Sequence, residues 1–269
     1  MRYWKGSIVL SPTRDQPLLR EVARSGFITH NQLSEALRLD YCASSRKAFN
    51  NRVLRLTKHG LLTRHAGLVG SREVAYSVST SGASALGGNG DPLVHSGKAG
   101  PPSVQTLRHC LDLNEIHLAL KHTGSLVYWM PETEVRSQSD VSPYGYWKYY
   151  DAVVVVRLAG QDCKFALEYE RTPKATRHYT AIRERIEQET AIRHFLYLVP
   201  NHDFMWFIAE KLSQCKRAVC IGLFHDFLEQ TLALPVRRSG SPATVTLASI
   251  LAHGKGSQRS GELFPGIAV

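Results

Sequence analysis

Residues 151–169 read DAVVVVRLAGQDCKFALEY, and this stretch decides the fold of the larger part of the chain. Asp151 precedes a strongly β-branched run, which is typical of a buried strand. Residues 159–162 (AGQD) have the composition of a hairpin turn, and a second apolar strand follows at Cys163–Tyr169. We therefore expect a β-hairpin that brings the carboxylates of Asp151 and Glu168 to one end of a sheet.

Helix and strand patterns alternate on both sides of this hairpin. Before it, we expect a helix over Ser103–Lys121, a strand over Ser125–Val135 and a loop over Asp140–Tyr146. After it, we expect a helix, a strand, a helix and a strand, at Lys174–Thr190, His194–Val199, Phe204–Gln214 and Arg217–Leu223. A hairpin followed by a strand–helix–strand crossover gives a mixed sheet with helices on its faces, so the fold class is α+β or α/β.

A smaller unit precedes this sheet. Apolar residues recur at helical spacing in Pro17–Arg24, in residues 29–37 and in Ser45–His59, where the buried side holds Phe49, Val53, Leu54 and Leu56. Two short apolar segments then flank a Gly-containing loop between residues 61 and 78, which predicts a β-hairpin. Three helices followed by such a hairpin are the pattern of a winged-helix DNA-binding module, which we place at residues 17–79.

Positive charge is concentrated in this winged-helix unit. Residues 1–86 hold 13 Lys and Arg against 5 Asp and Glu, whereas residues 87–269 hold 20 against 18. Such an excess predicts a polyanionic partner, and double-stranded DNA is the partner that a winged helix favours. A basic face used for protein contacts is the alternative. Arg and Asn can read bases and Lys can bind phosphate, so the candidate DNA-binding residues are Arg46, Lys47, Asn50, Asn51, Arg52, Arg55, Lys58, Arg64 and Arg72.

Composition also predicts the division of the chain. We expect a winged-helix domain at residues 1–86, a Gly- and Pro-rich linker at 87–102, an α/β domain at 103–236 and a mobile polar tail at 237–269. No stretch reaches the roughly 20 apolar residues that span a bilayer, and the N-terminus lacks the pattern of a signal peptide. We therefore expect a cytoplasmic protein without a membrane partner. The five cysteines form no CxxC pair, which argues against a disulfide scaffold or a structural zinc site.

The expected order of elements matches the core of the restriction-endonuclease-like fold, also called the PD-(D/E)XK fold. That fold places an Asp at the start of its second core strand and a Glu near the end of the third, the positions of Asp151 and Glu168. Paired carboxylates hold a hard cation such as Mg²⁺ or Mn²⁺, which activates water and neutralises phosphate. Asp151 and Glu168 are therefore the candidate metal ligands, and Glu115 is a candidate third oxygen ligand.

The third strand departs from the motif of that fold. An acid, any residue and then Lys are expected, whereas the chain has Glu168, Tyr169, Glu170 and Arg171. A basic group would have to come from Arg171, Lys174 or Lys148, and Arg is a poor proton donor because its pKa is so high. The catalytic candidates are Asp151, Glu168, Glu170, Arg171 and Glu115. The alternative is that these residues form a structural ion-pair cluster in a degenerate nuclease fold.

Several short motifs resemble those of the bacterial replication-relaxation family of plasmids and integrative elements. The resemblance covers residues 17–225. The segments on which the resemblance rests are the winged-helix segment, RHCLDLNEIHLAL (108–120), YYDAVVVV (149–156) and FALEYERTPKA (165–175). The matching residues are His109, Asn114, Glu115, Asp151, Glu168, Glu170 and Arg171. The acid-x-acid-Arg pattern is typical of that family, so the resemblance implies that Glu170 belongs to a shared pattern.

The resemblance implies DNA binding linked to replication, mobilisation or conjugative transfer of mobile DNA. We expect a DNA-binding accessory protein with an inactive nuclease-like domain, which assembles with a relaxase or a replication initiator protein and forms a homodimer. A winged-helix transcriptional regulator is the first alternative. A nicking endonuclease dependent on Mg²⁺ or Mn²⁺ is the second.

Overall fold

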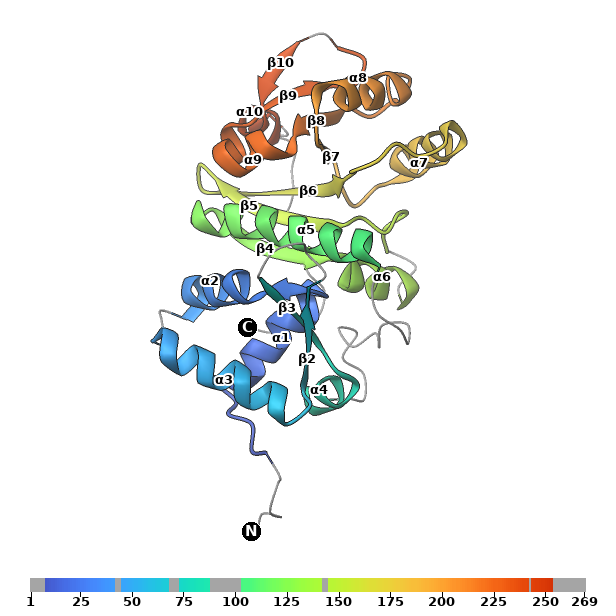
Figure 1. Cartoon of the computed structure of the whole chain (residues 1–269). Coiled ribbons are helices and arrows are strands. Elements are labelled where there is room, and N and C mark those ends of the chain that lie inside the picture. The colour runs from blue at the N-terminus through green and yellow to red at the C-terminus, as the bar shows by residue number, and fades with distance from the viewer. Residues whose placement is uncertain are drawn as a thin grey trace.

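The structure is a computed structural model that describes residues 8–41, 45–67, 73–87, 103–141, 145–241 and 243–253. An N-terminal part with a three-stranded sheet lies against a larger part with a seven-stranded sheet (Figure 1). Within the described ranges, none of the helices has the length and apolar character that crossing a membrane requires. Residues 88–102, which form most of the expected linker, lie outside the described residues.

The N-terminal part contains three helices before a β-hairpin. Its elements are α1 (Asp15–Ser25), β1 (Ile28–Thr29), α2 (His30–Tyr41), α3 (Arg46–Lys58), β2 (Leu62–Ala66), β3 (Val74–Val78) and α4 (Thr80–Ala85). Ser45 caps α3 by accepting a hydrogen bond from the backbone N–H of Ala48. The strand order is β1-β3-β2, and both pairs are antiparallel. Three helices before a hairpin are the order of elements expected from the sequence.

One core position of α3 was predicted wrongly. Phe49, Val53 and Leu56 are buried as expected, but Leu54 is 52% exposed. Successive residues of a helix are rotated by about 100°. Leu54 therefore points away from the buried stripe that Phe49, Val53 and Leu56 form, and it faces solvent.

The larger part is built on a mixed seven-stranded sheet in the order β10-β9-β8-β7-β6-β5-β4. Strands β6, β7 and β8 run parallel, and the other neighbouring pairs are antiparallel. The predicted hairpin is formed by β5 and β6, and Ala159 and Gly160 at its turn have φ angles of 49° and 78°. The strands are β4 (Leu126–Pro131), β5 (Ala152–Leu158), β6 (Gln161–Tyr169), β7 (His194–Val199), β8 (Val219–Leu223), β9 (Pro235–Arg238) and β10 (Thr244–Thr246).

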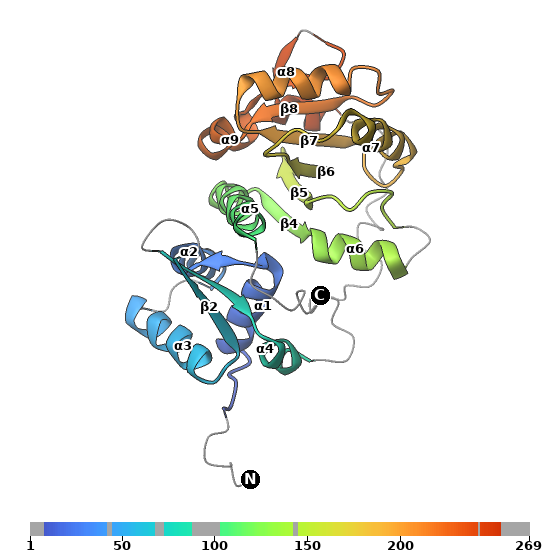
Figure 2. The same ribbon diagram turned by 45° about the vertical axis from the view of Figure 1, so that its right-hand side comes forward.

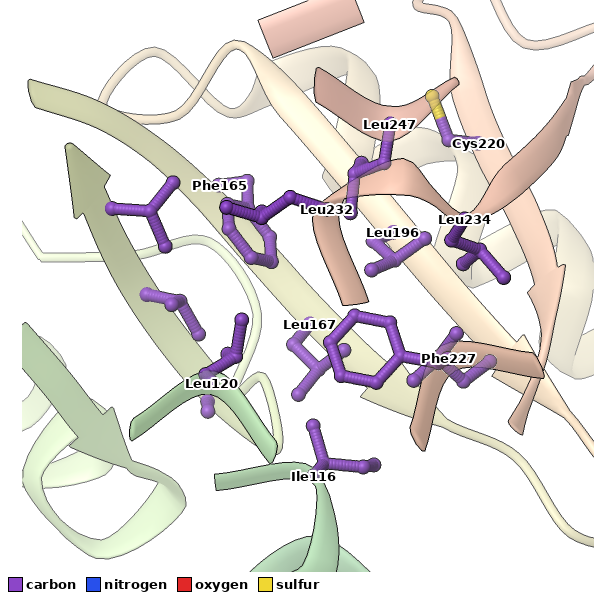
Figure 3. Packing of buried hydrophobic residues seen from close by; sticks show 14 of the residues in the cluster. Ile116, Leu120, Phe165, Leu167, Leu196, Cys220, Phe227, Leu232, Leu234 and Leu247 are labelled. Atoms are coloured by element: carbon purple, nitrogen blue, oxygen red, sulfur yellow. The ribbon is translucent and has the colours of Figure 1, made fainter. Parts of the chain in front are cut away.

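Helices cover both faces of this sheet. On one face, α5 (Val104–His122), α9 (Phe224–Gln230) and α10 (Leu247–Ala252) pack on side chains such as Phe165 and Leu167 (Figure 3). On the other face, α7 (Thr176–Gln188) and α8 (His202–Lys211) pack on Tyr197 and its neighbours. Figures 1 and 2 show α6 (Glu132–Val141) and α7 near the same end of the sheet. That end is where β5 begins and β6 ends.

Two predicted elements of the larger part differ from the structure. Residues 132–141 form α6, where a strand to Val135 and a loop from Asp140 were expected. Pro131 ends the strand, and Glu132 and Glu134 lie in the first turn of α6, where negative charge stabilises a helix.

The predicted mobile tail is also wrong for the part of it that the structure describes. Strand β9 pairs with β8 and β10, and the helix α10 that follows buries Leu247 and Leu251. This short hairpin was not predicted because its residues are mostly polar and because its partner strand β8 lies elsewhere in the chain. Residues 254–269 lie outside the described residues.

Candidate functional site

The register of β5 and β6 brings Asp151 and Glu168 to the same end of the sheet. Ala152 pairs with Leu167, and Asp151 and Glu168 are the next residues of the two segments. The negative charge of Asp151 raises the pKa of Glu168, although burial of Glu168 raises it more. The two carboxylates therefore interact, as the hairpin pattern predicted.

Asp151 is held by two protein donors. His109 of α5 shares a hydrogen bond between its Nε2 and Oδ1 of Asp151 at 3.2 Å, and the backbone N–H of Tyr169 donates to Oδ2 at 2.7 Å. Burial alone would raise the pKa of Asp151, but these bonds and the charge of Lys148 together lower it. Burial likewise opposes protonation of His109, yet Asp151 and nearby carboxylates raise the pKa of His109 overall. The His109–Asp151 pair is therefore stabilised in its charged form.

Glu168 is paired with Lys148, which precedes β5 in the chain. The Lys148 ammonium donates to Oε1 of Glu168, and the Glu168 residue is only 5% exposed. Burial raises the pKa of Glu168 to about 7, against the lowering effect of Lys148. Of the three basic residues proposed from the sequence, Lys148 is the one that contacts Glu168.

Glu170 and Arg171 form separate pairs beside this site. Oε1 of Glu170 accepts a hydrogen bond from the Tyr179 hydroxyl at 2.7 Å and lies 3.4 Å from the Lys174 ammonium. Oε2 of Glu170 is buried and has no hydrogen-bond partner among the described residues. Arg171 pairs with Asp112 of α5, with 3.3 Å between Nε and Oδ2. The residues Glu168, Glu170 and Arg171 of the acid-x-acid-Arg segment therefore each take part in an ion pair.

Glu115 does not join the carboxylate site. Its Oε1 accepts a hydrogen bond from Nε2 of Gln32 in α2 at 2.5 Å, so the side chain faces the N-terminal part. Glu115 lies six positions after His109, which places the two about 120° apart around the helix. The prediction of Glu115 as a third oxygen ligand is therefore wrong in this arrangement.

Helix α5 joins the carboxylate site to the N-terminal part. Asn114 donates to the backbone carbonyl of Phe27 at 2.7 Å, and Gln32 donates to that of Leu111 at 3.0 Å. Further along the helix, Lys121 donates to Asp40 at 2.7 Å. The same helix carries His109 and Asp112 toward the sheet end, so it fixes both parts of the molecule relative to each other.

The outer face of α3 carries most of the predicted DNA-binding residues. Exposed positions are Arg46, Lys47, Asn50, Asn51, Arg55 and Lys58, together with Arg64 on β2. Arg46 donates to Oδ1 of Asn31 at 2.7 Å, and Oδ1 of Asn50 lies 3.0 Å from Nε2 of His30. Arg72 lies outside the described residues.

Arg52 and Arg55 differ from the other predicted DNA-binding residues because both pair with Asp15. Asp15 of α1 is 1% exposed, and Nε of Arg52 lies 3.5 Å from its Oδ1. Arg55 donates to Oδ2 of the same carboxylate. The Arg52 side chain is only 15% exposed, so the expectation that it faces solvent is wrong. These two residues anchor α3 on α1.

A comparison with known families matches both the N-terminal part and the hairpin that carries Asp151 and Glu168. The family model described as replication-relaxation matches residues 19–193. The chain belongs to the replication-relaxation family. No curated protein matches this replication-relaxation protein at a significant level.

Among solved structures, this replication-relaxation protein is similar to the restriction endonuclease FokI bound to DNA. The TM-score is 0.26 and the sequence identity is 12%, over 83% of this chain and 45% of that one. The chain thus spans less than half the length of that neighbour.

The carboxylate site does not fit a divalent cation as it is arranged. Among the described residues, no three His, Cys, Asp or Glu side chains gather closely enough to hold a metal ion. Three of the four carboxylate oxygens of Asp151 and Glu168 accept hydrogen bonds from protein donors. Lys148 also supplies positive charge where Mg²⁺ or Mn²⁺ would have to bind, as does His109 when it is protonated, so electrostatic repulsion opposes the ion.

Sequence reasoning missed the partners of the carboxylates in this replication-relaxation protein. Lys148 was one of three candidates, and only the fold distinguishes it from Lys174. His109 entered through its family motif, without an expected partner. Asp15 was not predicted as a partner, although it lies in the first turn of α1, directly before the apolar residues of that helix. An acid at such a position, beside a helix rich in Arg and Lys, is a signal for an ion pair between the two helices.

Proposed function

We propose that this protein is a DNA-binding accessory protein that acts in replication, mobilisation or conjugative transfer of a plasmid or integrative element. Its N-terminal part acts as a winged helix that places α3 in the major groove of double-stranded DNA. The observation that carries the proposal is the exposed face of α3. That helix, RKAFNNRVLRLTK, has five basic residues, four of them exposed, and no Asp or Glu.

The exposed side chains of α3 have the chemistry that DNA recognition uses. Lys47, Asn50, Leu54 and Lys58 follow the three- and four-residue spacing of one helix face, and Asn51 lies beside them. Asn can bond the edge of adenine, an apolar side chain can contact the thymine methyl group, and Lys binds phosphate. The exposure of Leu54, which is unfavourable in a free protein, is thus consistent with a contact made on DNA.

Membership of the replication-relaxation family supports a role with mobile elements. The protein then works in the cytoplasm, where plasmid DNA is replicated and processed, and it recruits a relaxase or a replication initiator as a homodimer. The larger domain clamps DNA or a partner and does not cut efficiently. Support for this last point comes from the carboxylates, which are bonded to His109, Lys148 and the Tyr169 N–H.

We expect the triple variant Arg46→Ala, Lys47→Ala, Lys58→Ala to lose most of its affinity for double-stranded DNA. Each phosphate contact contributes about 1 kcal/mol near 0.15 M salt through counterion release, so three lost contacts weaken binding on the order of 100-fold. The slope of log K against log salt should fall by about 3. Fluorescence anisotropy with a labelled duplex, repeated at several salt concentrations, measures both quantities.

A charge-matched variant separates a local effect from a change in net charge. Arg157, Lys216 and Arg238 are exposed on the larger domain, and their replacement by Ala removes the same three charges. This control should keep the slope of the parent chain. Arg52 and Arg55 are left intact in both variants because they pair with Asp15. Equal affinity in the α3 variant and the parent chain would refute the proposed interface.

We expect no efficient nicking of supercoiled plasmid by the purified protein with Mg²⁺ or Mn²⁺. The reason is that Lys148 and His109 occupy the carboxylates that a cation would need. Agarose-gel conversion of supercoiled to nicked circles measures the activity, and Asp151→Ala serves as the matched variant. If the parent chain nicks DNA and Asp151→Ala does not, the nuclease alternative replaces the non-cutting domain proposed here.

A further inference from the structure

Asn50, on the exposed face of α3, is bonded to a side chain of another helix. Its Oδ1 lies 3.0 Å from Nε2 of His30, the first residue of α2. Because Oδ1 can only accept, Nε2 of His30 carries the hydrogen and donates it. The neighbouring Asn51 is exposed as well, but its side chain has no partner among the described residues. The two Asn residues of α3 therefore differ, since only Asn50 is anchored.

The other nitrogen of the His30 ring is held by the β2–β3 hairpin. The Tyr76 hydroxyl of β3 lies 3.4 Å from Nδ1 of His30, and the His30 ring also packs on the Phe49 and Tyr76 rings, with centroids 4.9 and 5.9 Å away. With the hydrogen on Nε2, Nδ1 of the neutral ring is an acceptor, so the Tyr76 hydroxyl donates to it. Tyr76 is only 7% exposed. The position of the His30 ring is therefore fixed from inside the N-terminal part.

Arg64 of β2 sets the direction of these hydrogen bonds. It lies directly opposite Tyr76 in the register of β2 and β3, and its guanidinium bonds the Tyr76 hydroxyl. A guanidinium can only donate, so the Tyr76 oxygen accepts from Arg64 and the Tyr76 hydrogen is left for His30. Each member of the chain thus donates toward Asn50. Hydrogen bonds that follow one another in one direction polarise and strengthen each other.

This chain of bonds leaves the Asn50 amide in one orientation. With Oδ1 held by His30, the Nδ2 group faces the opposite way and has no partner among the described residues. The N–H groups of Nδ2 and the second lone pair of Oδ1 stay available to a ligand. An adenine edge in the major groove is complementary, because N7 accepts and the N6 amino group donates. Guanine has two acceptors there, so its O6 would face Oδ1 with the same polarity.

We infer that His30 is a positioning residue that holds the Asn50 amide in the orientation that reads adenine in double-stranded DNA. This inference rests on the proposed DNA-binding function and names the residue pair that gives it base selectivity. The exposed Lys and Arg side chains supply affinity through phosphate, whereas the His30–Asn50 pair supplies discrimination between bases. Arg64 joins the two roles, because it bonds Tyr76 and keeps further N–H groups for a phosphate.

Selection from a duplex library identifies the base that Asn50 reads. The library carries about 20 randomised base pairs, enough for two half-sites one helical turn apart. Sequencing of the bound fraction gives the preferred base at each position. The parent chain should select adenine at one position of a half-site, and Asn50→Ala should lose that preference and keep the others. Asn51→Ala is the matched control and should keep adenine at the Asn50 position.

Replacement of His30 then measures its role at that position. His30→Phe keeps an aromatic ring on Phe49 and Tyr76 but has no donor for Asn50. Its preference for adenine over guanine should fall about threefold or more, the effect of one hydrogen bond of ordinary strength. His30→Gln places an amide N–H near the position of Nε2 and should restore most of the preference. Fluorescence anisotropy with the selected duplex, and with the same duplex carrying G·C for A·T at that position, measures both affinities.

Three further readouts distinguish positioning from a structural role. In the Asn50→Ala background, His30→Phe should leave the remaining base preferences unchanged, because it acts through Asn50. The slope of log K against log salt should stay at the parent value, since no phosphate contact is lost. Thermal unfolding should show that His30→Phe is folded. If it is not, Tyr76→Phe, which keeps the buried ring and removes only the hydroxyl, should lower the adenine preference in the same direction.

The outcomes separate this inference from the proposed function. Loss confined to the Asn50 position in His30→Phe, with recovery in His30→Gln, supports the inference. If the parent chain binds duplex DNA but selects no base through Asn50, or if His30→Phe keeps the adenine preference, the duplex interface stands and the inference is overturned. An equal loss at all positions in His30→Phe would mean that His30 only supports the fold, and would overturn it too. If the parent chain binds no duplex at all, the proposed function itself is refuted.

Discussion

Replacing Leu247 and Leu251 together by Ala should destabilise the larger domain by about 4 kcal/mol or more. The two side chains are 1% and 3% exposed and belong to the core that includes Phe165 and Leu232 (Figure 3). A buried Leu→Ala change typically lowers the free energy of unfolding by about 2–5 kcal/mol, through lost burial and the cavity that remains. Urea denaturation followed by far-UV circular dichroism measures the change.

An exposed position in the same helix provides the control. Ala252 is exposed, so Ala252→Ser should change the free energy of unfolding by less than about 0.5 kcal/mol. This comparison distinguishes a folded segment after Arg237 from a mobile one. If residues from Arg237 onward were a mobile tail, the double variant would unfold at the same urea concentration as the parent chain.

The hairpin of the larger domain could be predicted because its signals are local. The β-branched run after Asp151 and the AGQD turn are adjacent in the chain, so strand, turn and strand follow from neighbouring residues. The pairing of β9 with β8 is different, since Ile221 pairs with Arg237 across an intervening helix. A short strand with few apolar residues carries no periodic signal, and only its place beside β8 makes it a strand.

The carboxylate site likewise has one part that the sequence predicts and one part that it does not. Asp151 and Glu168 were brought together by the hairpin register, which the sequence specifies. The donors that neutralise them come from elsewhere: Lys148 lies 20 residues before Glu168, and His109 lies 42 residues before Asp151. Their approach depends on how α5 and the segment before β5 pack on the sheet end. Packing of that kind leaves no spacing pattern in the sequence.

Helix α3 was predicted correctly, but two of its residues were assigned to the wrong side of the helix. Periodicity identified Phe49, Val53 and Leu56 as buried, but an apolar residue between them was added to the core by its type alone. Arg52 was taken as exposed by its charge, although it lies three residues after Phe49 and beside the buried stripe. A buried Asp15 on α1 provides the partner that makes this position favourable.

Replacing Lys148 by Met should destabilise the larger domain in a pH-dependent way, by about 3 kcal/mol at pH 8.5 and by about 1 kcal/mol at pH 5.5. Met keeps the volume of the aliphatic stem but removes the ammonium beside Glu168. Breaking a buried ion pair by removing one partner is costly because the other charge stays buried. At pH 5.5 that cost is smaller, since the pKa of Glu168, raised by burial to about 7, keeps the folded carboxyl protonated.

The direction of this pH dependence follows from the pKa of the Glu168 carboxyl in the folded chain and in the unfolded chain. Its pKa is about 7 in the folded chain and 4.5 in its ordinary state, so the folded chain binds the proton more tightly. Glu168 therefore stabilises the fold as the pH falls toward 4.5, and this contribution is lost as the pH rises through 7. Without Lys148 the pKa should rise further, and the loss above pH 7 should be larger than in the parent chain.

Two further variants decide whether charge causes the effect. Lys148→Met combined with Glu168→Gln should show less pH dependence between 5.5 and 8.5 than Lys148→Met alone, because no titrating carboxyl remains in the pair and only other groups, such as His109, still titrate. Lys174→Met is the matched control: its ammonium pairs with Glu170 but is 44% exposed, so the loss should stay below about 1 kcal/mol. Thermal unfolding at the two pH values measures all three. A loss in Lys148→Met that is equal at both pH values would mean that Lys148 acts by packing over the Tyr150 ring, 5.0 Å from its ammonium, and not through the charge of Glu168.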